Sequence, residues 1–157
     1  MGSPKLKTKM SPLDHTLSIV QAEVEEFERL TKIFYTVADA ERKCFDNYEE
    51  MVPSMETLDH AVDGALTAKI LEVTFLREQA YIDVQRAHES VQHAYDDFHC
   101  AWQFEPNSRL AREAREEADK VNDKHRVNWE IAQEAYDACN DDDRLEHFNA
   151  WRQKQSK

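Results

Sequence analysis

The scarcity of helix-breaking residues constrains the fold of this chain more than any other feature. Its 157 residues include only 2 Gly and 4 Pro, so three long stretches are free of strong breakers. The composition, with 41% hydrophobic and 33% charged residues, is rich in helix formers. A sheet protein would need more turn residues. We therefore expect an all-α fold, and the length suits one domain with its own core.

The first helix is predicted over residues 12–52. Ser11 can cap it, and Pro12 suits the first helical position because its missing N–H group would be unpaired there. An apolar ladder with alternating steps of four and three residues predicts a coiled-coil-like face. This ladder consists of Leu13, Leu17, Val20, Val24, Phe27, Thr31, Phe34, Ala38, Glu41, Phe45, Tyr48 and Val52. Pro53 ends the helix, because proline disfavours the helical conformation in the residue before it.

Two further long helices are predicted over residues 55–104 and 108–139, separated by Pro106. The second has a long ladder of mostly Val, Ala and Leu. The third presents mainly alanine to the core, which lets helix axes approach closely. Short joints make successive helices antiparallel. If equal numbers of residues run back on either side of each joint, residue 41 should lie near residue 65, and residue 125 near residue 85.

The two ends of the chain differ from the helical body. Residues 1–10 carry Lys5, Lys7 and Lys9 without an acid, and we expect a disordered basic tail. Residues 11–157 are expected to form a single helical-bundle domain. The run "CNDDDR" at 139–144 has poor helix propensity, so the third helix either frays there or breaks. A break, followed by a short C-terminal helix over about 143–154, is the favoured interpretation.

Together these patterns predict an elongated antiparallel bundle of three long, coiled-coil-like helices plus a short C-terminal helix. In helix length and heptad spacing, the predicted bundle resembles spectrin-like and BAR-like bundles in outline. No signature motif accompanies this architectural resemblance.

The segment "DDFHCAWQFEPN" at 96–107 has the residue types of a metal or catalytic site. Asp96 and His99 come closest to the carboxylate–histidine motif of di-metal helical bundles, but no second motif stands at a matching register. The alternative is the end of a helix, with Trp102 and Phe104 plugging the bundle end. We favour this structural interpretation, and expect no metal, no cofactor and no catalytic residue.

Other motifs of chemistry are absent from the sequence. It contains no GxSxG, no glycine-rich phosphate loop and no HExxH, so we expect a protein without enzymatic activity. Cys44, Cys100 and Cys139 are odd in number and lack CxxC spacing, so reduced thiols are expected. Without a signal sequence or a long apolar run, we expect a soluble protein in the reducing cytoplasm.

Several polar residues occupy or flank ladder positions where a plain bundle would carry leucine. They are Thr31, Glu41, Lys69, Arg77, His125 and Asn128. Such residues commonly fix register and partner number. For Lys69 and Arg77, the preferred interpretation is that the long stems lie along the apolar surface and leave the charge in water.

The formal net charge of −12 argues against direct nucleic-acid binding. The leading hypothesis is a non-enzymatic protein-interaction or scaffold module that acts through helical surfaces. A protein partner is expected, for which the acidic surface would suit a basic one, and so is a homodimer or other homo-oligomer. The candidate interaction residues are Trp102, Phe104, Leu145, Phe148 and Trp151.

Two alternatives stay open. A BAR-like membrane-associated dimer could contact anionic lipid only through the basic termini, at Lys5, Lys7, Lys9, Arg152, Lys154 and Lys157. An acidic inhibitor or immunity-type protein would occupy a basic site on a partner. The inhibitor predicts one contiguous acidic face, whereas a scaffold predicts mixed signs.

Overall fold

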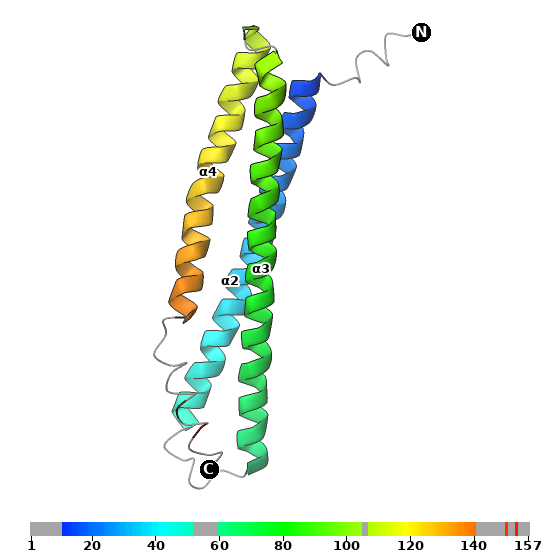
Figure 1. Ribbon diagram of the computed structural model, residues 1–157. Coiled ribbons are helices and arrows are strands. Elements are labelled where there is room, and N and C mark those ends of the chain that lie inside the picture. Colours follow the sequence, from blue (N-terminus) through cyan, green and yellow to red (C-terminus); the bar gives the residue numbers. More distant parts are fainter. Residues whose placement is uncertain (1–10, 52–59, 105–106, 141–149, 151–152, 154–157) are drawn as a thin grey trace, which may run out of the picture. The chain divides into compact units, whose positions relative to one another are not determined.

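The computed structural model describes residues 11–51, 60–104, 107–140, 150 and 153. It is an all-α arrangement of three helices packed against each other (Figure 1). Helix α2 spans Pro12–Met51, α3 spans His60–Phe104 and α4 spans Arg109–Asn140. None of the described helices has an apolar stretch long enough to cross a lipid bilayer.

The predicted helix bounds agree with this arrangement wherever they can be compared. The ends at 52, 104 and 139 each fall within one residue of the observed ends. The predicted start of the second helix at 55 and the basic tail at 1–10 lie outside the described residues. So does the predicted C-terminal helix over 143–154, apart from positions 150 and 153.

Serine caps begin α2 and α4. The N–H of Asp14 donates to Ser11 Oγ at 3.1 Å, and the N–H of Ala111 donates to Ser108 Oγ at 3.0 Å. Each bond satisfies one of the N–H groups that the first turn of a helix leaves unpaired. The predicted cap at Ser11 is confirmed, and Ser108 caps α4.

The chain divides into two compact units, and each helix contributes a segment to both. Among the described residues, unit 1 comprises 11–30, 84–104 and 107–130. Unit 2 comprises 31–51, 60–83 and 131–140, with positions 150 and 153.

Unit 1 has an apolar core in which α4 contributes small residues. Phe27 from α2 and Phe98 from α3 are fully buried, as are Ala111 and Ala118 from α4. Partners on α3 and α4 run in opposite directions along the two helices: His88 meets His125, and Tyr95 meets Asp119. The antiparallel prediction therefore holds, and the observed partner of His125, His88, lies three positions from the predicted neighbour, residue 85.

Unit 2 has a different register from the predicted one. Glu41 of α2 bonds Arg77 of α3, and Phe45 and Tyr48 cluster with Ile70. The predicted neighbour of residue 41 was residue 65, so that prediction is wrong. Pro53 predicts where α2 ends, but it does not predict how long the connection is between the packed faces of α2 and α3. The second joint is short, from Phe104 to Arg109, and the same counting of residues works better there.

The heptad ladders nevertheless identify the core correctly. Leu13, Val20, Val24, Phe27, Phe34, Phe45 and Tyr48 of the first ladder are buried, and so are Ile70, Val73, Ala80, Val84, Ala87, Val91, Ala94 and Phe98 of the second. Alternating steps of four and three keep side chains on one side of a helix, because they average 3.5 residues against the 3.6 of a turn.

The small core residues of α4 give a testable prediction. Replacing Ala118→Leu adds three carbon atoms where the native methyl group is fully buried, so we expect a loss of about 1–3 kcal/mol in the free energy of unfolding. Glu117 is exposed next to it, and Glu117→Leu is the matched control. Urea denaturation followed by circular dichroism measures both. Equal stability of the two variants would contradict close packing at Ala118.

Candidate functional site

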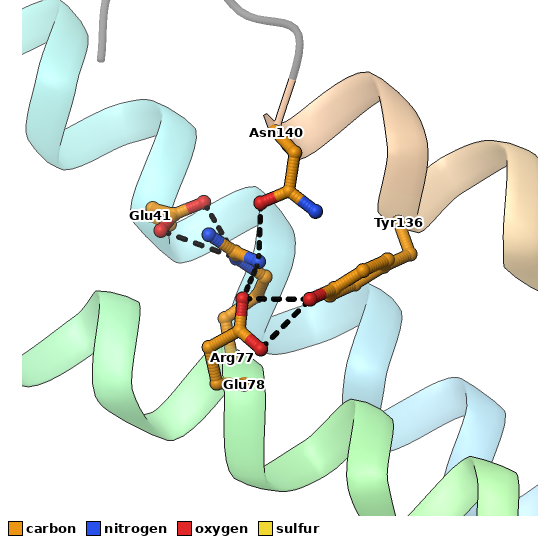
Figure 2. A network of polar contacts seen from close by, with 5 residues as sticks. All are labelled: Glu41, Arg77, Glu78, Tyr136 and Asn140. Carbon is orange, nitrogen blue, oxygen red and sulfur yellow. Dashed lines mark hydrogen bonds and ion pairs between the residues drawn. The ribbon is translucent and has the colours of Figure 1, made fainter.

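A buried polar network joins the three helices of unit 2. Arg77 of α3 is the centre, and its Nε donates to both carboxylate oxygens of Glu41 on α2, at 3.1 and 3.3 Å (Figure 2). Its Nη1 donates to Glu78 at 2.6 Å and approaches the side-chain oxygen of Asn140 at 3.5 Å. The hydroxyl of Tyr136 on α4 donates to Glu78 at 2.9 Å. One guanidinium therefore connects acceptors from all three helices.

The environment of Arg77 explains why a charge is tolerated there. Its side chain is only 2% exposed and that of Glu41 only 6%. Burial by itself would lower the pKa of Arg77, but the hydrogen bond and the charge of Glu41, with the charge of Glu78, raise that pKa above its usual value. The preferred interpretation from the sequence, that Arg77 keeps its charge in water, is wrong because a carboxylate meets it inside the core. Lys69 is exposed, in agreement with the expectation for that residue.

Aromatic rings pack beside the network in unit 2. Tyr81 and Tyr136 stack in parallel with centroids 3.8 Å apart, and Phe34 lies 5.3 Å from Tyr81. The guanidinium carbon of Arg77 is 5.5 Å from the centre of the Tyr136 ring. These contacts hold Tyr136 in the position from which its hydroxyl reaches Glu78.

A shallow groove of about 450 Å³ lies between α2 and α4 in unit 2. Tyr35, Phe45, Ala135 and Cys139 line it, with Glu41. The carboxylate of Glu41 already accepts from Arg77, so this groove does not offer an uncompensated charge to a ligand.

Unit 1 contains a directly bonded pair of histidines. His88 Nδ1 and His125 Nε2 are 2.8 Å apart, and the ring of Trp129 stacks on His88 at 4.1 Å. Phe27 meets the ring of His125 edge-on at 4.4 Å. His125 is 2% exposed, and its Nδ1 is buried without a hydrogen-bond partner. The sequence places His125 among the polar residues that occupy or flank ladder positions, and the structure buries it in the core of unit 1.

Burial disfavours protonation of this histidine pair. It lowers the pKa of His125 from 6.5 to about 4, and the neighbouring His88 adds to that shift. Burial also lowers the pKa of His88, against the smaller opposing effect of Glu89. Both rings are therefore neutral at pH 7, and one of them donates the N–H that the other accepts.

The segment at 96–107 is the end of α3, as far as it is described. Phe98 is buried in unit 1. Trp102 is half-buried, with the guanidinium of Arg115 on its ring at 4.3 Å. Phe104 is 86% exposed and does not plug the end of the bundle. Leu145, Phe148 and Trp151 lie outside the described residues, so the interaction role of all five residues stays a prediction.

The outer side of α3 in unit 2 carries an apolar surface that the sequence interpretation missed. Phe75 is 62% exposed and Leu71 is 43% exposed, and they are one helical turn apart. With Gly64, Ala68, Glu78 and Ile82 they follow a second ladder of alternating four- and three-residue steps. We call these six residues the outer stripe. The missed signal was the second heptad set, which spreads apolar residues around α3 more widely than around α2 or α4.

The described residues give little sign of a chemical site. Among them, no three or more His, Cys, Asp and Glu side chains are placed to hold a metal ion. Asp96 and His99 do not belong to such a group. Comparison of the chain with protein-family models, with curated protein sequences and with solved structures found no match.

The Glu41–Arg77 pair gives a prediction for stability. Glu41→Gln leaves a buried guanidinium with less charge compensation, so we expect a loss of about 3 kcal/mol in the free energy of unfolding. The double variant Glu41→Leu with Arg77→Met removes both charges and is expected to be much closer to the wild type. Urea denaturation of Glu41→Leu, Arg77→Met and the double variant, each compared with the wild type, measures the coupling between the two positions.

An exposed ion pair provides the control for the Glu41 and Arg77 variants. Arg109 Nε and Glu113 are also 3.0 Å apart, but both side chains are more than half exposed. Glu113→Gln should change stability little, because solvent screens the pair. A Glu41→Gln variant as stable as Glu113→Gln would show that the buried pair does not stabilise the fold.

The histidine pair predicts a pH dependence of stability. Because the pKa of His125 is lower in the fold than in the unfolded chain, the unfolded chain binds more protons between about pH 4 and 6.5. The free energy of unfolding therefore has its full value above about pH 6.5, where the ring of His125 is neutral in both states. It falls as the pH is lowered towards 4, because protonation then favours the unfolded chain. The loss should be on the order of 3 kcal/mol for His125.

Urea denaturation at pH 7.5 and pH 4.5 tests this expectation. His125→Gln should lose less stability on acidification than the wild type, whereas His93→Gln, at an exposed position, should lose as much. The same acid sensitivity in all three proteins would rule out His125 as its source.

Proposed function

We propose that this chain is a non-enzymatic protein-interaction module, and that its binding surface is the outer stripe of α3 in unit 2. The single observation that carries the proposal is the exposure of Leu71 and Phe75 on a helix whose other side is already buried. An isolated exposed apolar residue needs no explanation, but a heptad-spaced set on one helix face is typical of a surface that packs on another helix.

The surroundings of the outer stripe support recognition of a helix. Glu72 and Gln79 border one side of it, and Thr67 and Thr74 border the other. A weakly charged rim around large apolar side chains is the usual composition of a protein interface. Leu76 is 47% exposed, but it lies one position beyond Phe75 and so falls outside the stripe.

The core groups support a structural role for the polar side chains. Arg77 is bonded to Glu41 and Glu78, and His88 is bonded to His125. These titratable groups are occupied with one another inside the two units. They stabilise one packing arrangement, and we assign recognition to the surface.

The distribution of charge favours a scaffold over an acidic inhibitor. Exposed pairs of opposite sign occur along α2 and α4: Arg29 with Glu26, Lys43 with Asp39, Arg109 with Glu113, and Arg126 with Asp123. An inhibitor that mimics nucleic-acid charge would need acids without such neighbours on one face. The basic residues on which a membrane role would depend lie outside the described residues.

Affinity capture with the immobilised chain tests the proposal. Proteins retained from a lysate of the native host should be lost with Phe75→Glu, because a charge on the outer stripe would have to be buried in the complex. Leu76→Glu is the matched control, since it adds the same charge at the next, similarly exposed position. If both variants retain the same proteins as the wild type, the outer stripe is not the binding surface.

A further inference from the structure

We propose that the occupant of the outer stripe is a second copy of this chain, packed antiparallel on α3 so that the two copies form a two-fold symmetric dimer. This inference rests on the proposed function, and it names the partner of the same surface.

Self-complementarity of side-chain size supports the dimer. In an antiparallel pair of helices, residues of the two ladder positions face each other. We call the line along which the outer stripes of the two copies would meet the seam. A two-fold axis between positions 71 and 75 places Leu71 opposite Phe75 of the second copy. It also places Ile82 opposite Gly64, and Ala68 opposite Glu78. Each large or long side chain therefore meets a smaller one, except at the centre, where two large apolar side chains meet.

Gly64 offers open space for the opposing isoleucine. Among the residues that the structure describes, and apart from its chain neighbours and the backbone of its own helix, nothing lies within 4 Å of where a Cβ atom on Gly64 would stand. A glycine inside a helix lowers helix stability relative to alanine, so its position on the seam needs a reason. Room for Ile82 of the second copy provides that reason.

The charges of the outer stripe favour the antiparallel arrangement over a parallel one. In a parallel pair, Glu78 would face Glu78 of the second copy, and Gly64 would face Gly64. In the antiparallel pair, Glu78 faces Ala68, and its carboxylate is already held on its own chain by Arg77 and Tyr136. The polar network thus leaves the apolar stem of Glu78 for the seam.

The seam is short, so the dimer should be reversible. From Gly64 to Ile82 it extends about 27 Å along α3 at 1.5 Å per residue. A single pair of helices over that length falls at the small end of interface sizes, where complexes are transient. Glu72 borders the two-fold axis and lies near Glu72 of the second copy. This repulsion should weaken the dimer, and added salt should strengthen it.

Molar mass in solution gives the first test. Light scattering and sedimentation over a range of concentrations should show a monomer–dimer equilibrium for the wild-type chain. Phe75→Glu should raise the dissociation constant at least about 30-fold, as expected at the centre of an interface. Leu76→Glu should change it by less than about threefold. Glu72→Gln should lower it by roughly two- to fivefold in the antiparallel arrangement only.

Disulfide cross-linking gives the second test, in a background where Cys44, Cys100 and Cys139 are replaced by alanine. Circular dichroism first establishes that this background folds. The double variant Gly64→Cys with Ile82→Cys should form covalent dimers on mild oxidation, whereas each single variant should not. The two positions cannot bond within one chain, because about 27 Å of helix separates them and a disulfide needs Cα atoms within about 7 Å.

The possible outcomes separate this inference from the proposed function. A chain that remains monomeric up to about 1 mM overturns the dimer. If Phe75→Glu still abolishes capture of other proteins, the proposed function survives that result. Efficient cross-linking of the Ile82→Cys single variant would overturn the antiparallel arrangement. A dimer that Phe75→Glu does not weaken would overturn the assignment of the dimer contact to the outer stripe. If Phe75→Glu then also captures the same proteins as the wild type, the proposed function is overturned as well.

Discussion

The ion pair between Glu41 and Arg77 sets the register on which the rest of unit 2 depends. Heptad ladders of similar apolar residues can pack in several registers, because a shift of one heptad presents a similar face. A buried guanidinium restricts that freedom, since a shifted register would separate it from Glu41, its carboxylate partner on α2. In the observed register, Phe45 and Tyr48 cluster with Ile70. The Glu41–Arg77 pair therefore favours one pairing of α2 with α3, whatever its net contribution to stability.

The sequence contains most of the fold but only part of its register. The ladders and serine caps predict which residues are buried and where helices begin, because both depend on contacts within a few turns of one helix. The pairing of α2 with α3 depends on the length of the connection between the packed faces, and no local pattern encodes that length. Arg77 shows the limit clearly. Its place among polar ladder residues was visible, but whether it turns to water or to a carboxylate depends on which residue of α2 lies opposite.

The surface was harder to predict than the core for a related reason. Large aromatic residues near helix ends point to Trp102 and Phe104 as interaction residues in the sequence. The structure adds Leu71 and Phe75, which are exposed in the middle of a helix segment. A second apolar ladder can be read from the sequence of α3. Both ladders have the same period, but only the core ladder continues with apolar residues beyond position 82. The pattern therefore identifies the core, but it does not tell what the shorter ladder meets.

The same network links the interior of unit 2 to its surface. Glu78 lies on the outer stripe, where a free carboxylate would resist burial against another helix. Arg77 and Tyr136 hold that carboxylate from the side of the core, so its charge is partly compensated before any partner arrives. A neutral residue at position 77 alone would leave Glu41 buried without its arginine partner, and it would also leave Glu78 on the stripe with less charge compensation. In unit 2, one guanidinium thus takes part both in the buried contact with Glu41 and in holding the carboxylate of Glu78 on the surface that we propose for recognition.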